Sequence, residues 1–78
     1  MIAVVLSPEK KLFEGNVVSV LVPGEQGSFE ILSNHAPIIS SLVEGEIICK
    51  GDTEFRMKIT GGCVEVSSNV ISLCVESK

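Results

Sequence analysis

The sequence lacks the elements of a disulfide framework. Its 78 residues include three cysteines, Cys49, Cys63 and Cys74, which is an odd number, and no two of them form a Cys-x-x-Cys pair. Reduced thiols are therefore expected, as in proteins of a reducing compartment. A zinc site needs about four ligands, and only His35, the single histidine, could join the three thiols. Since no ligand spacing is present, we expect neither a metal nor another cofactor.

Clustered positive charge and long apolar runs are also scarce. Six Lys and Arg residues against ten Asp and Glu residues give a formal net charge of −4, and the only basic cluster is Lys10-Lys11. Nucleic acid binding needs a clustered basic surface, so no nucleic acid partner is expected. No apolar stretch approaches the ~20 residues that span a bilayer, so we expect no direct membrane insertion. With 45% hydrophobic residues, the chain is still too apolar for a disordered tail.

Alternating polarity takes the place of a helical pattern. No window longer than a turn has helical periodicity, whereas a period of two, typical of strands with one buried face, runs through almost the whole chain. In residues 54–60, Phe55, Met57 and Ile59 fall on one face and polar residues fall on the other. The sequence therefore predicts strands throughout.

Glycine, proline and other turn residues divide the chain into seven to nine short strands. The expected strands are 2–6, 17–22, 28–32, 38–43, 47–50, 54–60, 63–67 and 70–75. The break at Ser68-Asn69 predicts a hairpin between the last two. Many short strands with such turns are typical of an all-β fold, a small antiparallel β-sandwich or flattened barrel. A chain of this length forms one domain, residues 1–78.

The apolar residues of these strands predict a core and leave an excess. The expected core residues are Val18, Val20, Val22, Phe29, Ile31, Phe55, Met57, Ile59, Val64, Val66, Ile71, Leu73 and Val75. The strands at 17–22 and 38–43 are apolar on both faces, which is more than a free-standing small sandwich needs. The excess indicates a docking surface.

No catalytic constellation can be assembled from the sequence, so we expect no enzyme. His35 lies in the turn-like stretch 34–37 without a nucleophile signature beside it. A cysteine enzyme is an alternative that would show selective, pH-dependent alkylation of one thiol. Gly24 and Gly27 lack the Lys, the Ser or Thr and the helix of a phosphate loop. They are expected instead to permit positive φ in a tight turn.

A carrier domain is the alternative function. Biotinyl and lipoyl carriers are small β-sandwiches with a modified lysine, often beside methionine, at a hairpin tip, and Met57-Lys58 invites the comparison. Lys58, however, lies in the middle of the best alternating strand, and an attachment lysine must reach a distant active site from a turn.

An ordered series of motifs covers nearly the whole chain. Its most specific parts are Val-Pro-Gly-Glu-Gln-Gly-Ser-Phe-Glu-Ile-Leu-Ser-Asn-His-Ala-Pro at 22–37 and Thr-Gly-Gly-Cys-Val-Glu-Val at 60–66. This series resembles the N-terminal β-sandwich domain of the epsilon subunit of F-type ATP synthases, which is called delta in mitochondria.

The resemblance implies a non-catalytic rotor subunit at the foot of the central stalk. It implies packing against the gamma subunit and the polar loops of the c-ring, within a complex of alpha, beta, gamma, delta and epsilon subunits. The chain would couple c-ring rotation to gamma and the catalytic head, at the cytoplasmic face of a bacterial cell membrane.

The resemblance also assigns roles to residues. Ser28, Asn34 and His35 are implied contacts to the c-ring, and Pro37 would make their loop rigid. Gly61-Gly62 matches a bulge or close approach of strands, where a β-carbon would obstruct packing.

Family members commonly continue into a C-terminal helical hairpin that can inhibit ATP hydrolysis. Because this sequence stops at Lys78, the inhibitory function is expected to be absent, in a natural short form or in a fragment.

Overall fold

A computed structural model describes residues 1–78, which form eight β-strands and no helix. The strands are β1 (Ile2–Leu6), β2 (Lys11–Gly24), β3 (Gly27–Leu32), β4 (Ile38–Leu42), β5 (Gly45–Gly51), β6 (Phe55–Ile59), β7 (Gly61–Ser67) and β8 (Val70–Glu76). Since the chain has no helix, it has none with the length and apolarity to cross a membrane. The predicted number of strands is confirmed, and β1 has the predicted bounds.

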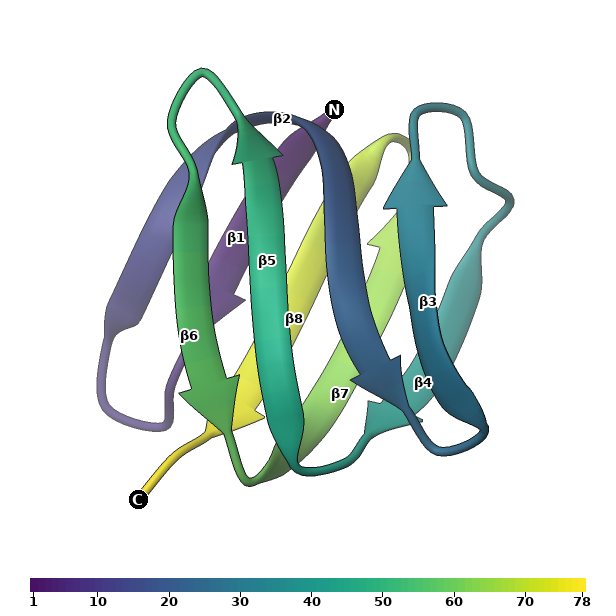
Figure 1. Cartoon of the computed structure of the whole chain (residues 1–78). Helices are drawn as coiled ribbons and strands as arrows, with labels where there is room; N and C mark the ends of the chain where they lie inside the picture. Colours follow the sequence, from purple (N-terminus) through teal and green to yellow (C-terminus); the bar gives the residue numbers. More distant parts are fainter.

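The strands form two layers, a front layer and a back layer in the view of Figure 1. β6, β5 and β3 form the front layer, and β1, β8, β7 and β4 form the back layer. β2 serves both layers, because its residues 11–16 pair with β1 and its residues 17–24 pair with β5 and β3. The predicted all-β sandwich is confirmed, and the shared strand makes it one continuous sheet.

The strand pairs are antiparallel except for one. β1 and β8, which lie at opposite ends of the sequence, run parallel side by side. The predicted hairpin is confirmed as β7 and β8. Its turn residues Ser68 and Asn69 have φ of 51° and 65°, which is the pattern of a two-residue type I′ turn.

The core lies between the layers and contains nine of the thirteen predicted residues together with six that the prediction leaves out, which are Ala3, Val5, Val17, Leu42, Ile47 and Cys49. The buried apolar residues are Ala3, Val5, Val17, Val20, Val22, Ile31, Leu42, Ile47, Cys49, Ile59, Val64, Val66, Ile71, Leu73 and Val75. Phe29, Phe55 and Met57 pack against this core and are only partly buried.

The prediction for Val18 is wrong. Its side chain is 67% exposed, whereas that of Val17 is buried. The pairing of β2 with β5 shifts register between Val17 and Ser19, so the alternation of inward and outward side chains changes phase there. This irregularity lies where β2 passes from the back layer to the front layer.

An aromatic pair covers one open side of the sandwich. Phe13, in the first half of β2, stacks on Phe55 at the start of β6, with ring centroids 4.9 Å apart and planes 19° apart. β6 has no strand partner other than β5. At this side of the sandwich the two layers are therefore joined by the aromatic contact and not by backbone hydrogen bonds.

Candidate functional site

The turns of the sandwich gather at two ends, which define its candidate contact surfaces (Figure 1). We call the end that carries loop 33–37, turn 52–54 and turn 68–69 the upper end. The lower end carries turns 7–10, 25–26 and 43–44 and the connection at Thr60.

Reactive side chains do not converge into a catalytic cluster. Cys49 is buried in β5, and burial raises the pKa of its thiol to about 11. Cys63 and Cys74 lie in the lower half of the back layer, while His35 lies in the loop at the upper end. No three His, Cys, Asp or Glu side chains stand together as metal ligands.

The structure does not bring the four predicted contact residues together. Ser28 is the second residue of β3 and lies at the lower end, whereas Asn34, His35 and Pro37 lie in the loop after β3 at the upper end. The six residues of β3 span about 20 Å. Ser28 therefore lies at the opposite end of β3 from the other three predicted contacts.

Hydrogen bonds hold the loop at the upper end in a defined shape. The His35 N–H donates to the Leu32 carbonyl at 3.2 Å. The Asn34 N–H donates to Oδ1 of Asn69 in the β7–β8 turn at 3.5 Å. His35 Nδ1 lies 2.7 Å from the Ala36 carbonyl oxygen. Because a carbonyl only accepts, Nδ1 carries the proton of this contact.

Large apolar side chains are exposed around this loop. Ile39, near the start of β4, is 78% exposed, and Val18, just past the crossover in β2, is 67% exposed. Leu32, at the end of β3, is 52% exposed, and Val70, at the start of β8, is 39% exposed. We call these four side chains the apolar group. Leu32 lies on the outer face of the front layer and Ile39 on the outer face of the back layer, so the group surrounds the upper end and is not one flat patch. Exposed apolar side chains of this kind suit a partner that encloses this end.

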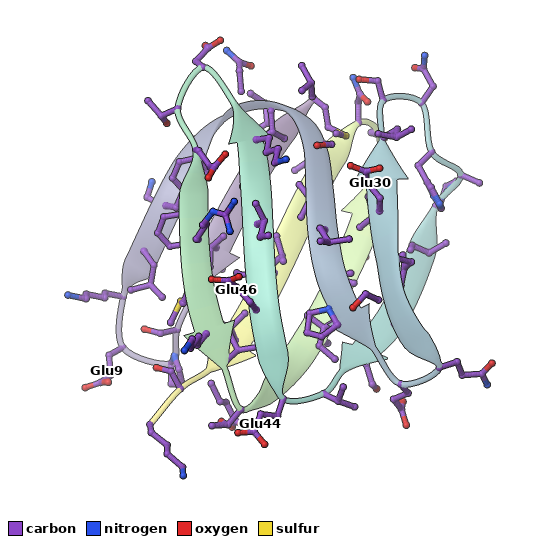
Figure 2. All side chains as sticks on the ribbon, in the orientation of Figure 1. Glu9, Glu30, Glu44 and Glu46 are labelled. Atoms are coloured by element: carbon purple, nitrogen blue, oxygen red, sulfur yellow. The ribbon has the colours of Figure 1, made fainter.

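The lower end has the opposite character. Figure 2 shows Glu9 and Glu44 projecting from two of its turns. The charged side chains in the turns and at the strand ends of this end are Glu9, Glu25, Glu44, Glu76, Lys10, Lys11 and Lys78. Four carboxylates against three ammonium groups make the lower end slightly acidic. Its one exposed large apolar side chain is Val43, at 40%.

Glycines shape the β2–β3 turn beside Ser28. Gly27 has φ of 119°, a conformation that side-chain-bearing residues rarely adopt. The prediction of positive φ is wrong for Gly24, whose φ is not positive. Gly24 is needed for space instead, because a β-carbon there would lie 2.8 Å from the Phe29 ring and 2.9 Å from the Gly27 carbonyl oxygen. The turn also borders a shallow hollow with Glu25 and Ser40.

The two glycines of the Gly61-Gly62 pair differ in the space that is left for a side chain. Gly62 has φ of 148°, and an added β-carbon would collide with the Cys74 carbonyl oxygen on β8. At Gly61 the nearest atom would be 3.8 Å away. Sequence reasoning missed Gly51, where an added β-carbon would meet the Asn16 carbonyl oxygen at the crossover of β2.

Lys58 lies where the sequence places it, inside a strand. It is an exposed residue of β6 opposite Glu46 of β5, and neither neighbour in the chain belongs to a turn. Met57 packs against the core. The geometry offers no projecting hairpin tip for a carrier lysine.

Comparison with known proteins gives consistent matches. Residues 2–78 match the family described as ATP synthase, Delta/Epsilon chain, beta-sandwich domain. The chain is 42% identical over 73 residues to the ATP synthase epsilon chain of Leptospira borgpetersenii, covering 92% of this chain and 58% of that one. The epsilon chain of Caulobacter vibrioides is 38% identical, with 91% and 84% covered. The chain thus spans somewhat more than half of the Leptospira relative.

Solved structures share the fold. A chain in the central stalk and c-ring structure of the Tetrahymena thermophila mitochondrial ATP synthase superposes with a TM-score of 0.85 at 17% identity, covering 97% of this chain and 63% of that chain. A chain of the Euglena gracilis mitochondrial ATP synthase gives a TM-score of 0.87 at 16% identity, covering 96% and 49%. Together with the family match and the epsilon-chain relatives, this likeness establishes that the chain belongs to the family of the ATP synthase delta/epsilon chain β-sandwich domain.

Proposed function

We propose that the chain is a non-catalytic rotor subunit of an F-type ATP synthase that joins the gamma subunit to the c-ring. The observation that carries this proposal is the contrast between the two ends of the sandwich. The upper end exposes Val18, Leu32, Ile39 and Val70, and the lower end exposes acidic turns. A body with two different contact surfaces at opposite ends suits an adaptor between two partners.

The gamma subunit is the partner proposed for the apolar group. Burial of apolar surface is the dominant favourable term in most protein association, and obligate contacts between subunits are the more hydrophobic class. The loop that carries Asn34, His35 and Pro37 lies at the same end of the sandwich as the apolar group. We therefore propose these three residues as gamma contacts rather than c-ring contacts.

The c-ring is the partner proposed for the lower end. Ser28, Glu25 and Glu44 belong to its turns and strand starts, and acidic side chains complement polar loops that carry basic groups. Ser28 keeps the c-ring role that the sequence suggested. Gly24 and Gly27 would hold the turn that presents it.

The sandwich itself would transmit torque. β2 runs through both layers, and the hydrogen-bond ladder continues from β6 to β1. A load applied at one end therefore reaches the other through covalent chain and paired strands. Relatives from Leptospira and Caulobacter support a place at the cytoplasmic face of a bacterial membrane, held there through the complex with its alpha, beta, gamma and delta subunits.

Substituting Ile39 tests the gamma contact. Ile39→Asp is expected to weaken binding of the purified gamma subunit by at least about tenfold, equivalent to about 1.4 kcal/mol, because it places an unpaired carboxylate in an apolar interface. Isothermal titration calorimetry would give the dissociation constants. Val43→Asp is the matched control, since Val43 is also exposed but lies at the lower end, and a change below about threefold is expected. Equal effects of the two substitutions would contradict the assignment of ends.

A charge reversal tests the c-ring contact. Glu44→Lys is expected to reduce retention of the gamma–epsilon pair on detergent-solubilised c-rings by about three- to tenfold, since an exposed ion pair contributes at most about 1 kcal/mol and reversal adds repulsion. Glu30→Lys makes the same charge change on β3, away from the lower end (Figure 2), and should leave retention within about twofold. Retention unchanged in Glu44→Lys would count against the lower end as the c-ring surface.

A further inference from the structure

Two exposed cysteines lie side by side on the outer face of the back layer. Cys63 in β7 is directly opposite Cys74 in β8, and both thiols are free and exposed. They line one surface hollow with Leu6, Pro8 and Gly62. Nothing in the proposed rotor function uses this pair.

The hairpin geometry sets the separation of the pair. In a two-residue type I′ hairpin the residues flanking the turn, here Ser67 and Val70, form a hydrogen-bonded pair, and pair types then alternate along the ladder. The register is continuous from Ser67↔Val70 to Cys63↔Cys74, so the cysteines also form a hydrogen-bonded pair. Their Cα atoms are then about 5.5 Å apart, which lies within the range that disulfides adopt.

The surroundings leave the thiols accessible without activating them. Leu6 of β1 is the next neighbour of Cys74, and Ser41 of β4 is the next neighbour of Cys63. The hollow has no Lys or Arg lining, and its one charged group is Glu76. Partial desolvation raises the pKa of the Cys74 thiol, and the adjoining Cys63 raises it further. Such a thiol pair equilibrates with disulfides in solution by thiol–disulfide exchange, and neither thiol is a fast nucleophile.

We propose that Cys63 and Cys74 are a reversible dithiol site that closes to a disulfide across the β7–β8 hairpin, with a low-molecular-weight disulfide such as oxidised glutathione as oxidant. The Cys63 thiolate attacks one sulfur of the oxidant, forms a mixed disulfide and releases one thiol. Cys74 then gives up its proton and attacks Cys63 Sγ, which releases the second thiol. Two electrons pass from the protein to the oxidant, and the two protons leave on the two released thiols.

A disulfide between Cys63 and Cys74 would be readily reduced. Exposed disulfides exchange with thiols in solution. In a hydrogen-bonded pair the β-carbons stand farther apart than in the other pair type, so the strands must draw together slightly to close the bond. The site therefore reports the redox state around the chain instead of serving as a permanent crosslink.

Thiol counting and mass spectrometry test the proposal on the chain of 78 residues. After equilibration with excess oxidised glutathione, the thiols titrated in denaturant are expected to fall from three to one. The intact mass should fall by two hydrogen atoms, and a peptide map should join Cys63 to Cys74. Cys49 should remain free, because it is buried. Dithiothreitol should restore all three thiols.

Single-cysteine replacements separate ring closure from other oxidation. Cys63→Ser and Cys74→Ser must each abolish the loss of two hydrogen atoms while leaving the circular dichroism spectrum unchanged. A stable glutathione adduct on the unsubstituted chain, a disulfide-linked dimer or an unchanged thiol count would each overturn the proposal. None of these outcomes bears on gamma or c-ring binding, so the rotor proposal is tested independently.

Discussion

Replacing Ile31 with alanine is expected to lower the free energy of unfolding by about 2–5 kcal/mol. Ile31 lies in β3 with its side chain fully buried between the layers. Its removal gives up apolar burial and leaves a cavity between the two layers, which their hydrogen-bonded strands keep apart. A domain of this size has a total stability near the low end of about 5–15 kcal/mol, so the variant is expected to be largely unfolded at 37 °C.

The adjacent residue is the control. Leu32 has a side chain of similar size, but it is 52% exposed on the opposite face of β3. Leu32→Ala should therefore cost less than about 1 kcal/mol in the isolated chain. Urea unfolding followed by circular dichroism measures both variants against the unsubstituted protein. Similar losses for the two would mean that β3 is shifted by one residue, since such a slip exchanges its faces.

The alternation of side chains predicts most of the fold because each strand buries one face. β1 has the predicted bounds, and the Ser68-Asn69 break marks the turn of β7 and β8. The first half of β2 was missed, because Gly15 and Asn16 interrupt its alternation. Its pairing with β1, which depends on residues elsewhere in the chain, fixes it as a strand. Val18 was misplaced because a register shift cannot be read from a period of two.

The sequence predicts individual residues of the candidate site but not which of them lie at the same end of the sandwich. The family resemblance implies one contact for Ser28 and His35, yet β3 separates the two residues along its length. The apolar group combines side chains from β2, β3, β4 and β8, and local sequence does not show that these strands bring them to one end. The Cys63 and Cys74 pair did have a signal, since both are equally distant from the predicted turn at Ser68-Asn69.

Substituting Gly62 is the second change with a large expected effect. Gly62 has φ of 148°, which glycine adopts at little cost and alanine does not. An alanine β-carbon would also collide with the Cys74 carbonyl oxygen and lie 3.0 Å from Cα of Val75. These are backbone atoms of the neighbouring strand, so no side chain can move aside. Backbone strain and overpacking together predict a loss of about 2–5 kcal/mol for Gly62→Ala.

Gly61→Ala distinguishes this explanation from a general intolerance of side chains at the start of β7. At Gly61 φ is not positive, and the nearest atoms to an added β-carbon are the Leu42 carbonyl oxygen at 3.8 Å and Glu76 Oε1 at 3.9 Å. Those are ordinary contacts, so Gly61→Ala should change the free energy of unfolding by no more than about 0.5 kcal/mol. Denaturant unfolding of both variants decides the matter. If Gly62→Ala were as stable as Gly61→Ala, β7 and β8 could not approach as closely as the register of Gly62 with Val75 requires.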